Sequence, residues 1–391
     1  MVSRKIRRLP ITWVLILSLF VGCSVFVGCH AEPAAEPEVV LGLIASITGK
    51  HPSGKMTVDG VLLAMEEVND AGGVWVDGQR HELRLLVEDS GAIPEVAISK
   101  AQKLISKDRV SALLGVQISL DAIPVSKVAE QHRVPMLTTL ATHPDVTTGK
   151  DYSFRMIFTD AFQARVLAAL VSQDLEMRRA AIMVEAGSNY SSMFSEIFSA
   201  AFQELGSEVV ATEIFASDAE DFSVQFEKIL AAEPDFVLAP LSPFLIERLV
   251  LAAREAGVEV PFVGADTWGV YKPENPLRGK SYYTDVWVAT ADDKRSRDFV
   301  QAFEAKYQRP PSSAAAIAYD GLHLLVSVIE AQKSTSPESI RQGLAATDGF
   351  HGVTGIVRFR DSGDPARSAI LVRLSANGER QAVQRIDPEE G

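Results

Sequence analysis

One loop near the start of the sequence has the residue types of a phosphate-binding site. Gly49, Gly54 and Lys55 lie between a predicted strand and a predicted helix, with the Gly-x4-Gly-Lys spacing that cradles phosphates. The next residue is Met56, where a Ser or Thr would be needed to ligate magnesium. A helix N-terminus of this kind can still bind a carboxylate through its free N–H groups. We therefore expect a glycine-bearing loop ahead of a helix N-terminus here and no nucleotide.

Other patterns that carry catalysis are missing from the sequence. It contains no Gly-x-Ser-x-Gly elbow, no His-Glu-x-x-His and no Gly-x-Gly-x-x-Gly after the first predicted strand. The seven histidines include no i,i+4 pair that would present two metal ligands on one helical face. The two cysteines, Cys23 and Cys29, both lie near the N-terminus. We expect a protein that is not an enzyme and that holds neither a metal nor a cofactor.

The composition is that of a folded, acidic protein. Hydrophobic residues make up 47% and charged residues 23% of 391 residues, which excludes a largely disordered chain and predicts about two domains. The 38 Lys and Arg against 51 Asp and Glu give a formal charge of −13. Because a nucleic-acid partner requires a concentrated basic face, we expect none.

The first 29 residues have the pattern of an export signal. Four basic residues occur within residues 1–8, and no charged residue occurs within 9–29. The phrase Phe-Val-Gly-Cys occurs twice, ending at Cys23 and at Cys29, and resembles a bacterial lipobox. Either cysteine could carry the lipid anchor, and residues 30–37 would form a tether. The alternative is an uncleaved transmembrane anchor of 21 apolar residues. Both alternatives predict a body held at a membrane outside the cytoplasm.

From residue 38 onward, short β-rich runs alternate with longer helical patterns. A continuous apolar run at 39–47 is typical of a strand buried on both faces of a parallel sheet, and an amphipathic helix follows at 56–69. Alternation continues to about residue 158, and a second series runs from a helix at 161–176 to a strand at 262–264. Two such series predict two α/β lobes with parallel sheets.

Several phrases occur in one colinear order that resembles a known family. They are Thr48-Gly49, Asn69 to Gly73, Glu88-Asp89, Gly115 to Ser119, Val134 to Leu137, Ala141 to Pro144, Phe154-Arg155, Asp221-Phe222 and Ala318 to Asp320. Together they are similar to the branched-chain amino-acid-binding proteins, the substrate-capturing subunits of ABC importers. The resemblance implies a type I periplasmic binding fold, in which two doubly wound parallel-sheet lobes, joined by three crossovers, enclose a ligand cleft. Amide sensors and receptor ectodomains share this fold, so the fold alone does not establish transport.

The resemblance also implies lobe boundaries and the N-lobe half of a site. We expect an N-lobe of residues 38–158 plus about 290–350, and a C-lobe of residues 159–289 plus about 351–391. Ser119 would bind the ligand carboxylate together with the free N–H groups of the following helix. Thr142 and the backbone of Leu140 would complete this half. An ordinary N-cap role is the alternative for Ser119.

In the C-lobe, the resemblance places Tyr190 at a helix start and Asp266 just beyond a short strand. Asp266 would bind the ligand ammonium, where the commoner family residue is Glu; a solvated loop aspartate is the alternative. Tyr190 would line the cleft, although a lone aromatic side chain also serves packing. Ser242 stands where many members have a tyrosine, which leaves the specificity for the ligand side chain open.

These residues predict capture of an amino acid, branched-chain or otherwise apolar, by lobe closure. The closed protein would deliver its ligand to ABC permease subunits, which this chain does not contain. The alternative is a binding or sensor protein for an amide, a urea-like compound or an aromatic acid.

Overall fold

The computed structural model describes residues 37–48, 53–270, 281–289, 293–360, 362–375 and 379–387. All of them belong to one compact unit that starts at Pro37. The predicted export signal, both cysteines and most of the tether lie outside the described residues, as do Gly49 and His51 of the first loop.

The first sheet is doubly wound around its central strand. Its order is β2-β3-β1-β4-β5-β6. Strand β1 pairs with β3 on one side and with β4 on the other. All pairs are parallel except the β2–β3 hairpin. The strands are β1 (Glu38–Ala45), β2 (Val74–Val76), β3 (Gln79–Asp89), β4 (Ala112–Gly115), β5 (Met136–Thr138) and β6 (Ser153–Arg155). The apolar run predicted at 39–47 is therefore the sheet's centre, buried as expected for a parallel strand.

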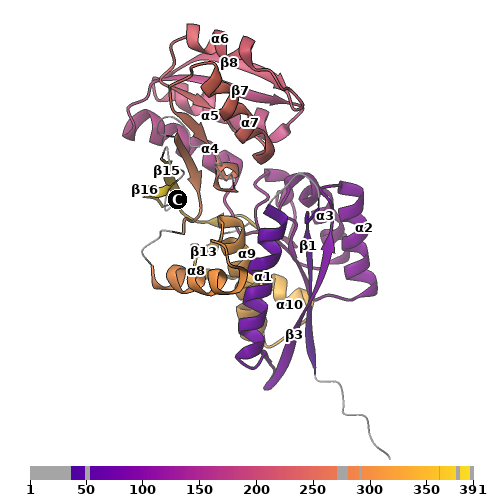
Figure 1. The fold of residues 1–391 in the computed structure, drawn as a ribbon. Coiled ribbons are helices and arrows are strands. Elements are labelled where there is room, and N and C mark those ends of the chain that lie inside the picture. Colours follow the sequence, from indigo (N-terminus) through magenta and orange to yellow (C-terminus); the bar gives the residue numbers. More distant parts are fainter. Residues whose placement is uncertain are drawn as a thin grey trace, which may run out of the picture. The chain divides into compact units, whose positions relative to one another are not determined.

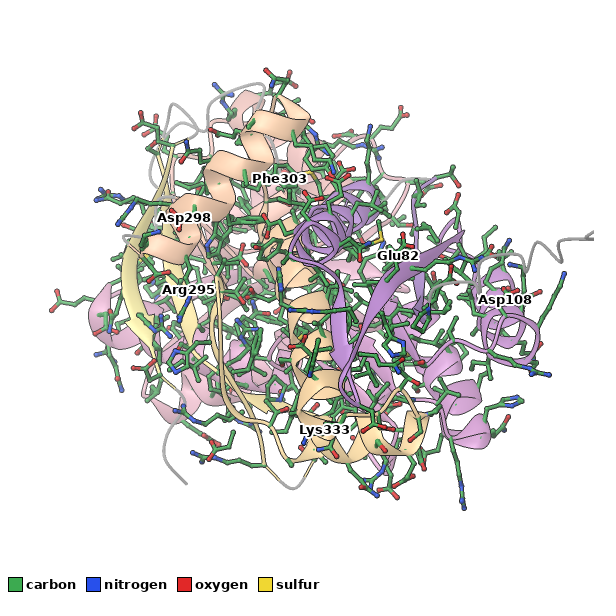
Figure 2. The ribbon with its side chains drawn as sticks, turned by 90° about the horizontal axis from the view of Figure 1, so that it is seen from below. Glu82, Asp108, Arg295, Asp298, Phe303 and Lys333 are labelled. Carbon is green, nitrogen blue, oxygen red and sulfur yellow. The ribbon has the colours of Figure 1, made fainter. Side chains whose placement is uncertain are left out.

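Helices from both ends of the chain cover this sheet. They are α1 (Ser53–Asp70), α2 (Pro94–Gln102), α3 (Ser119–His132), α8 (Lys294–Tyr307), α9 (Ser313–Gln332) and α10 (Pro337–Ala345). In Figure 1, the indigo α1 and the orange α9 lie side by side. Gly60 permits this contact, because a Cβ there would lie 2.2 Å from the carbonyl oxygen of Ala315. Helix α8 carries Phe303 into the same core and keeps Asp298 exposed (Figure 2).

Helix α9 is apolar because it is a core helix. Its length and hydropathy would suit a membrane span, but 72% of its most apolar window is buried within the protein. It packs on α1 and contacts β2 and β4.

The second sheet has seven strands in the order β16-β15-β11-β10-β9-β7-β8. The strands are β7 (Arg179–Ala186), β8 (Glu208–Ala216), β9 (Phe236–Leu238), β10 (Phe262–Gly264), β11 (Ser281–Asp285), β15 (Ala369–Leu374) and β16 (Arg380–Ile386). The five strands from β11 to β8 in this order pair in parallel. Strand β15 pairs antiparallel with β11, and β16 pairs antiparallel with β15. The accompanying helices are α4 (Asp160–Ala169), α5 (Asn189–Glu204), α6 (Ser223–Ala231) and α7 (Pro243–Glu255). The chain thus has two α/β lobes, as the sequence predicts.

A third, small sheet packs on the first lobe. It consists of β12 (Asp348–Gly352), β13 (Gly355–Phe359) and β14 (Pro365–Ala366). Val357 and Phe359 belong to the same core cluster as β1 and α9, and Phe359 contacts Phe154 edge-on. Strands β12 to β14 therefore lie with the N-lobe core, whereas the sequence places the return to the C-lobe near 351. We propose a boundary at about residue 367.

Two buried arginines brace the segments that connect the lobes. Arg155 ends β6, just before the first crossing, and donates from Nε to Asp364 Oδ1 at 2.5 Å. Arg367 lies between β14 and β15 and donates to the carbonyl oxygens of Met156 and Thr354, the latter at 2.8 Å. Since Met156 is in the first crossing and Arg367 in the last, these hydrogen bonds hold the two connecting segments together.

Candidate functional site

The N-lobe half of the site is formed where α3 begins. Helix α3 starts at Ser119 and its N-cap residue, Ile118, has no side-chain cap. Instead, Ser119 Oγ accepts a hydrogen bond from the backbone N of His143 at 3.3 Å. The hydroxyl proton of Ser119 is therefore left to donate to an acceptor outside the helix. A helix start of this kind, with a hydroxyl beside it, suits a carboxylate.

Arg155 fixes the loop that carries Thr142. Its Nη1 donates to the carbonyl oxygen of Ala141 at 2.7 Å, and its Nη2 donates to that of His143 at 3.0 Å. The guanidinium thus holds the residues on both sides of Thr142, and a fork of this geometry is specific to arginine. Leu140, which precedes this segment, is half-buried and packs against the N-lobe core.

The first crossing brings Thr142 next to an acid that opens helix α4. The backbone N of Asp160 donates to the carbonyl oxygen of Thr142 at 3.1 Å. The side chain of Asp160 is 1% exposed, and neither of its oxygens accepts a hydrogen bond of good geometry from the described residues. The Thr142 hydroxyl beside this carboxylate and the charge of Arg155 oppose the rise in the pKa of Asp160 that its burial causes. An unsatisfied, buried carboxylate thus faces the N-lobe half of the site.

One turn further along α4, Gln163 connects to Asp266. With its amide oriented to satisfy every partner, Gln163 Nε2 donates to Asp266 Oδ1 at 3.0 Å, and its Oε1 accepts from Asp266 N at 2.9 Å. Residues at i and i+3 share a helical face, so Asp160 and Gln163 both point toward the segment after β10. Asp266 begins the 3-10 helix Asp266–Val270 there and is half-buried.

Tyr190 and Ser242 complete the C-lobe side. The hydroxyl of Tyr190 lies 3.5 Å from Thr267 Oγ1, next to Asp266. Ser242 is the N-cap of α7, and its Oγ donates to Glu185 Oε2 at 2.8 Å, with its backbone N at 3.2 Å from the same oxygen. Ser242 therefore holds a buried acid at the end of β7, in a position where sequence reasoning expected contact with a ligand.

The electrostatics of the site favour a cation. Burial raises the pKa of Asp160 to about 7, with the charge of Asp266 adding to the effect, and burial raises the pKa of Asp266 to about 6. Burial also raises the pKa of Tyr190, and Asp266, Asp160 and Glu185 raise it further, so the hydroxyl stays protonated. Within the described ranges, no Lys, Arg or His forms an ion pair with Asp160 or Asp266. A cation placed here would relieve these unfavourable charges.

A cavity of about 710 Å³ adjoins the 3-10 helix that begins at Asp266. Its wall includes Gly269 of that helix and Asp285 at the end of β11. Asp285 is 2% exposed, and its pKa is raised to about 7 by burial and by the charge of Asp266. The charges of Asp266 and Asp285 are therefore close enough to interact, near the 3-10 helix that begins at Asp266. A second cavity, of about 510 Å³, lies along α8 and α9, and neither cavity is lined by a predicted site residue.

The structure thus joins most of the predicted residues into one series of contacts. It runs from Ser119 through His143 and Thr142 to Asp160, and from Gln163 through Asp266 and Thr267 to Tyr190. Sequence reasoning missed several members, namely Arg155 as a positioning residue, Asp160, Gln163, Glu185 and Asp285. The available signal was an acid at the end of a predicted strand or at the start of a predicted helix, which is where open α/β sheets bind ligands.

Comparisons with known proteins define the class. Residues 38–379 match the family described as periplasmic binding protein, so the chain belongs to that family. It is thus a solute-binding protein of the extracytoplasmic class, with the type I fold of two lobes.

Several members that bind amino acids are similar along most of the chain. The leucine-, isoleucine-, valine-, threonine- and alanine-binding protein of Pseudomonas aeruginosa is 25% identical over 356 residues, covering 89% of this chain and 92% of the relative. A leucine-binding protein from Thermotoga maritima is 26% identical with a TM-score of 0.80, covering 90% of this chain and all of that one. A branched-chain amino acid transporter substrate-binding protein from Streptococcus pneumoniae, in complex with isoleucine, has 25% identity, the same TM-score and the same coverage.

Proposed function

We propose that this protein captures an α-amino acid between its lobes and delivers it to an ABC importer. The carrying observation is the charge pattern of the site. At the α3 end, a helix start and the Ser119 hydroxyl suit a carboxylate. At the other end, Asp160 and Asp266 are buried or half-buried acids without an ion-pair partner among the described residues. A zwitterion has the opposite charges at the matching ends.

In this proposal, each half of the ligand has its own set of contacts. The carboxylate accepts from Ser119 Oγ and from N–H groups at the start of α3, with Thr142 and the Leu140 backbone beside it. The ammonium donates to Asp160 and Asp266, and Tyr190 closes over it. Three hydrogen-bonding directions around an ammonium match two carboxylates and one hydroxyl. Asp160 is added to the residues expected from the sequence, and Ser242 acts through Glu185.

Closure of the lobes makes these contacts strong. Ser119 and Thr142 belong to the N-lobe, whereas Gln163, Tyr190 and Asp266 belong to elements of the second sheet's lobe. Rotation about the segments braced by Arg155 and Arg367 would bring the halves together and expel water, so that charge-assisted hydrogen bonds form in a low dielectric. No bond in the ligand is broken, and we propose no enzymatic activity.

The acid pattern disfavours the alternative of an aromatic-acid ligand. Such an anion would face Asp160, Asp266 and Asp285, with no positive group of its own to pair with them. An amide or urea-like ligand is neutral and would leave the same acids without a counter-charge.

A thermal-shift screen on the full chain in detergent tests the function. Ligands that bind only the folded state raise the melting temperature by mass action. At a ligand concentration a hundredfold above Kd, the free energy of unfolding increases by about 2.7 kcal/mol. We expect one or more of the twenty amino acids to stabilise the protein and aliphatic or aromatic acids without an amine to leave it unchanged. Stabilisation by an acid or an amide, with none by amino acids, would refute the proposed ligand class.

We further propose that the body is anchored outside the cytoplasm by a lipid on Cys23 or Cys29. Metabolic labelling with a radioactive fatty acid, comparing Cys23→Ser, Cys29→Ser and the double variant, should show which cysteine carries the label. Persistence of membrane attachment without label in all variants would instead indicate the uncleaved transmembrane anchor.

A further inference from the structure

A buried amide lies beside the carboxylate end of the site and has no role in the account so far. Gln117 lies between the end of β4 and the start of α3, two residues before Ser119. It is 5% exposed, and its Nε2 is buried without a hydrogen-bond partner among the described residues. A buried donor without an acceptor lowers stability, so its presence in a folded protein needs a physical reason.

The turn that carries Gln117 is strained and is held in place from both sides. Val116 has a φ of 42°, in the left-handed region that a β-branched residue rarely adopts. Its backbone N donates to the carbonyl oxygen of Ile44 in β1 at 2.7 Å, and its carbonyl oxygen accepts from Thr138 Oγ1 in β5 at 2.9 Å. Strain of this kind persists where neighbouring elements fix it, and it is common at binding sites. The direction in which the chain leaves β4 is therefore fixed.

The backbone after this turn directs Gln117 and Ser119 to the same side. Ile118, between them, is extended, with φ −105° and ψ 127°. Side chains on the two sides of an extended residue point in the same direction. Ser119 Oγ accepts from the backbone N of His143, which leaves its hydroxyl proton free to donate. The start of α3 thus presents an amide and a hydroxyl as two neutral donors.

The acid in the first turn of α3 has a partner of its own. Asp121 Oδ2 accepts from Ser90 Oγ at 2.6 Å, on the side of the loop that follows β3. Burial raises the pKa of Asp121, with the charge of Glu95 adding to the effect, which favours its neutral form. Asp121 therefore neither satisfies the Gln117 amide nor requires a cation at this helix start.

Resting on the proposed function, we propose that Gln117 is a binding residue whose Nε2 donates a hydrogen bond to the ligand carboxylate beside Ser119. The two oxygens of a carboxylate accept about four hydrogen bonds, so there is room for this donor next to Ser119 and the N–H groups of α3. The ligand supplies the acceptor that the described residues lack. The amide then recognises a group that all α-amino acids share.

Two substitutions of Gln117 test this role by calorimetry on the full chain in detergent. The probes are the common L-amino acids that stabilise the unmodified protein in the thermal-shift screen. Gln117→Met keeps the length of the side chain and removes the donor. It should raise the ligand-free melting temperature and weaken every probe by a similar factor, about tenfold or more. Gln117→Glu places a second anion against the carboxylate and should weaken binding about a hundredfold or more.

Gln342→Met is the matched control, because Gln342 is exposed on α10 and its Nε2 donates to Glu338 Oε1 at 2.8 Å. This variant should bind every probe as the unmodified protein does. Unchanged affinity in Gln117→Met would overturn the proposal, because the amide would then only pack or bind water. Weakening of some probes and not others would also overturn it, since Gln117 would then contact the ligand side chain.

A crystal structure of the unmodified protein with its tightest-binding probe decides even if neither Gln117 variant folds. We expect Nε2 within about 3.2 Å of a carboxylate oxygen. An Nε2 that donates to water or to a protein group in that complex would overturn the proposal. Failure of every amino acid to bind contradicts the proposed function itself, so the two failures are distinguishable.

Discussion

At the scale of residues, two buried aspartates near the crossings have opposite surroundings. Asp320 is 1% exposed and accepts from the backbone N atoms of Val353 and Thr354, both at 2.8 Å. Asp160 is equally buried, yet its oxygens lack hydrogen bonds of good geometry within the described residues. A buried acid whose oxygens accept hydrogen bonds stabilises the structure around it. A buried acid without such hydrogen bonds lowers stability and would gain from a bound cation.

Asp160→Asn should therefore separate binding from stability. Removing the charge should raise the melting temperature of the ligand-free protein, because a desolvated carboxylate is lost. The same change should weaken amino-acid binding by about 2 to 5 kcal/mol, because the ammonium loses a buried partner. Differential scanning calorimetry and titration calorimetry check both effects. Asp320→Asn is the matched control, for which we expect lower stability. Lower stability together with unchanged affinity in Asp160→Asn would assign Asp160 a structural role.

Ser119→Ala tests the carboxylate end. We expect an affinity loss of about 0.5 to 1.5 kcal/mol, the usual value for one neutral hydrogen bond among several. Ser336→Ala is a useful comparison, because Ser336 is an N-cap whose Oγ accepts from Ser339 N at 3.2 Å. That variant should reduce stability and leave ligand affinity unchanged. An identical pattern for Ser119→Ala would mean that Ser119 only supports its helix.

Of the residues proposed to bind the ammonium, some are easier to find in the sequence than others. Asp266 and Tyr190 follow strands, so their positions at the sheet edge are visible in the sequence. Asp160 follows a crossing, and an acid at the start of a helix also fits a simple interaction with the helix dipole. Only the tertiary contact with Thr142 shows that it faces the site.

At the scale of elements, the loop between β5 and β6 depends on a single guanidinium. Arg155 donates to three carbonyl oxygens of this loop, to Thr147 Oγ1 at 2.7 Å and to Asp364. The loop carries Thr142 and Leu140, and Asp364 lies just before β14. The same side chain thus orders the site loop and ties it to the last connecting segment.

Arg155→Lys keeps the charge and removes the fork. We expect a loss of about 1.5 to 3 kcal/mol in the free energy of unfolding, the range for a hydrogen bond to a charged group, and weaker ligand binding. Urea titration and calorimetry measure the two effects. Arg84→Lys, at an exposed ion pair with Glu38 of 3.0 Å, should change neither. Unchanged affinity in Arg155→Lys would show that the loop orders itself without the fork.

The elements were predictable where strands and helices alternate regularly. The predicted strand at 262–264 coincides with β10, and the helix predicted to start at Tyr190 is α5, which begins one residue earlier. The alternation predicts neither the β2–β3 hairpin nor the elements after residue 264. Beyond that point β11, β15 and β16 join the second sheet while α8 to α10 and β12 to β14 pack on the first lobe. Local periodicity does not specify to which sheet a segment returns.

At the scale of the whole molecule, two buried acids and one half-buried acid link stability and binding to pH. The folded-state pKa values of Asp160, Asp266 and Asp285 are raised to about 7, 6 and 7, above the ordinary value for aspartate. Between about pH 4 and 7 the folded state thus binds more protons than the unfolded state, and stability falls as pH rises. Burial also raises the pKa values of Asp121 and Asp320, which act in the same direction, whereas it lowers the pKa of His143, which acts in the opposite direction.

The melting temperature of the ligand-free protein should therefore decrease from pH 5 to pH 8. The stabilisation by a bound amino acid should increase over the same range, because the ionised acids bind the ammonium more strongly. Thermal melts with and without ligand across this range measure both trends. A ligand-free melting temperature that rises steadily through pH 6 to 7 would contradict the inferred protonation of these acids.

The central claim is that buried acids recognise an α-ammonium group. The most direct measurement is titration calorimetry with the amino acid that gives the largest thermal shift and with its analogue in which hydrogen replaces the α-ammonium. The account predicts that the analogue binds at least a hundredfold more weakly, because the acids are then buried against a ligand without a positive charge. Equal affinity for the two compounds would contradict it.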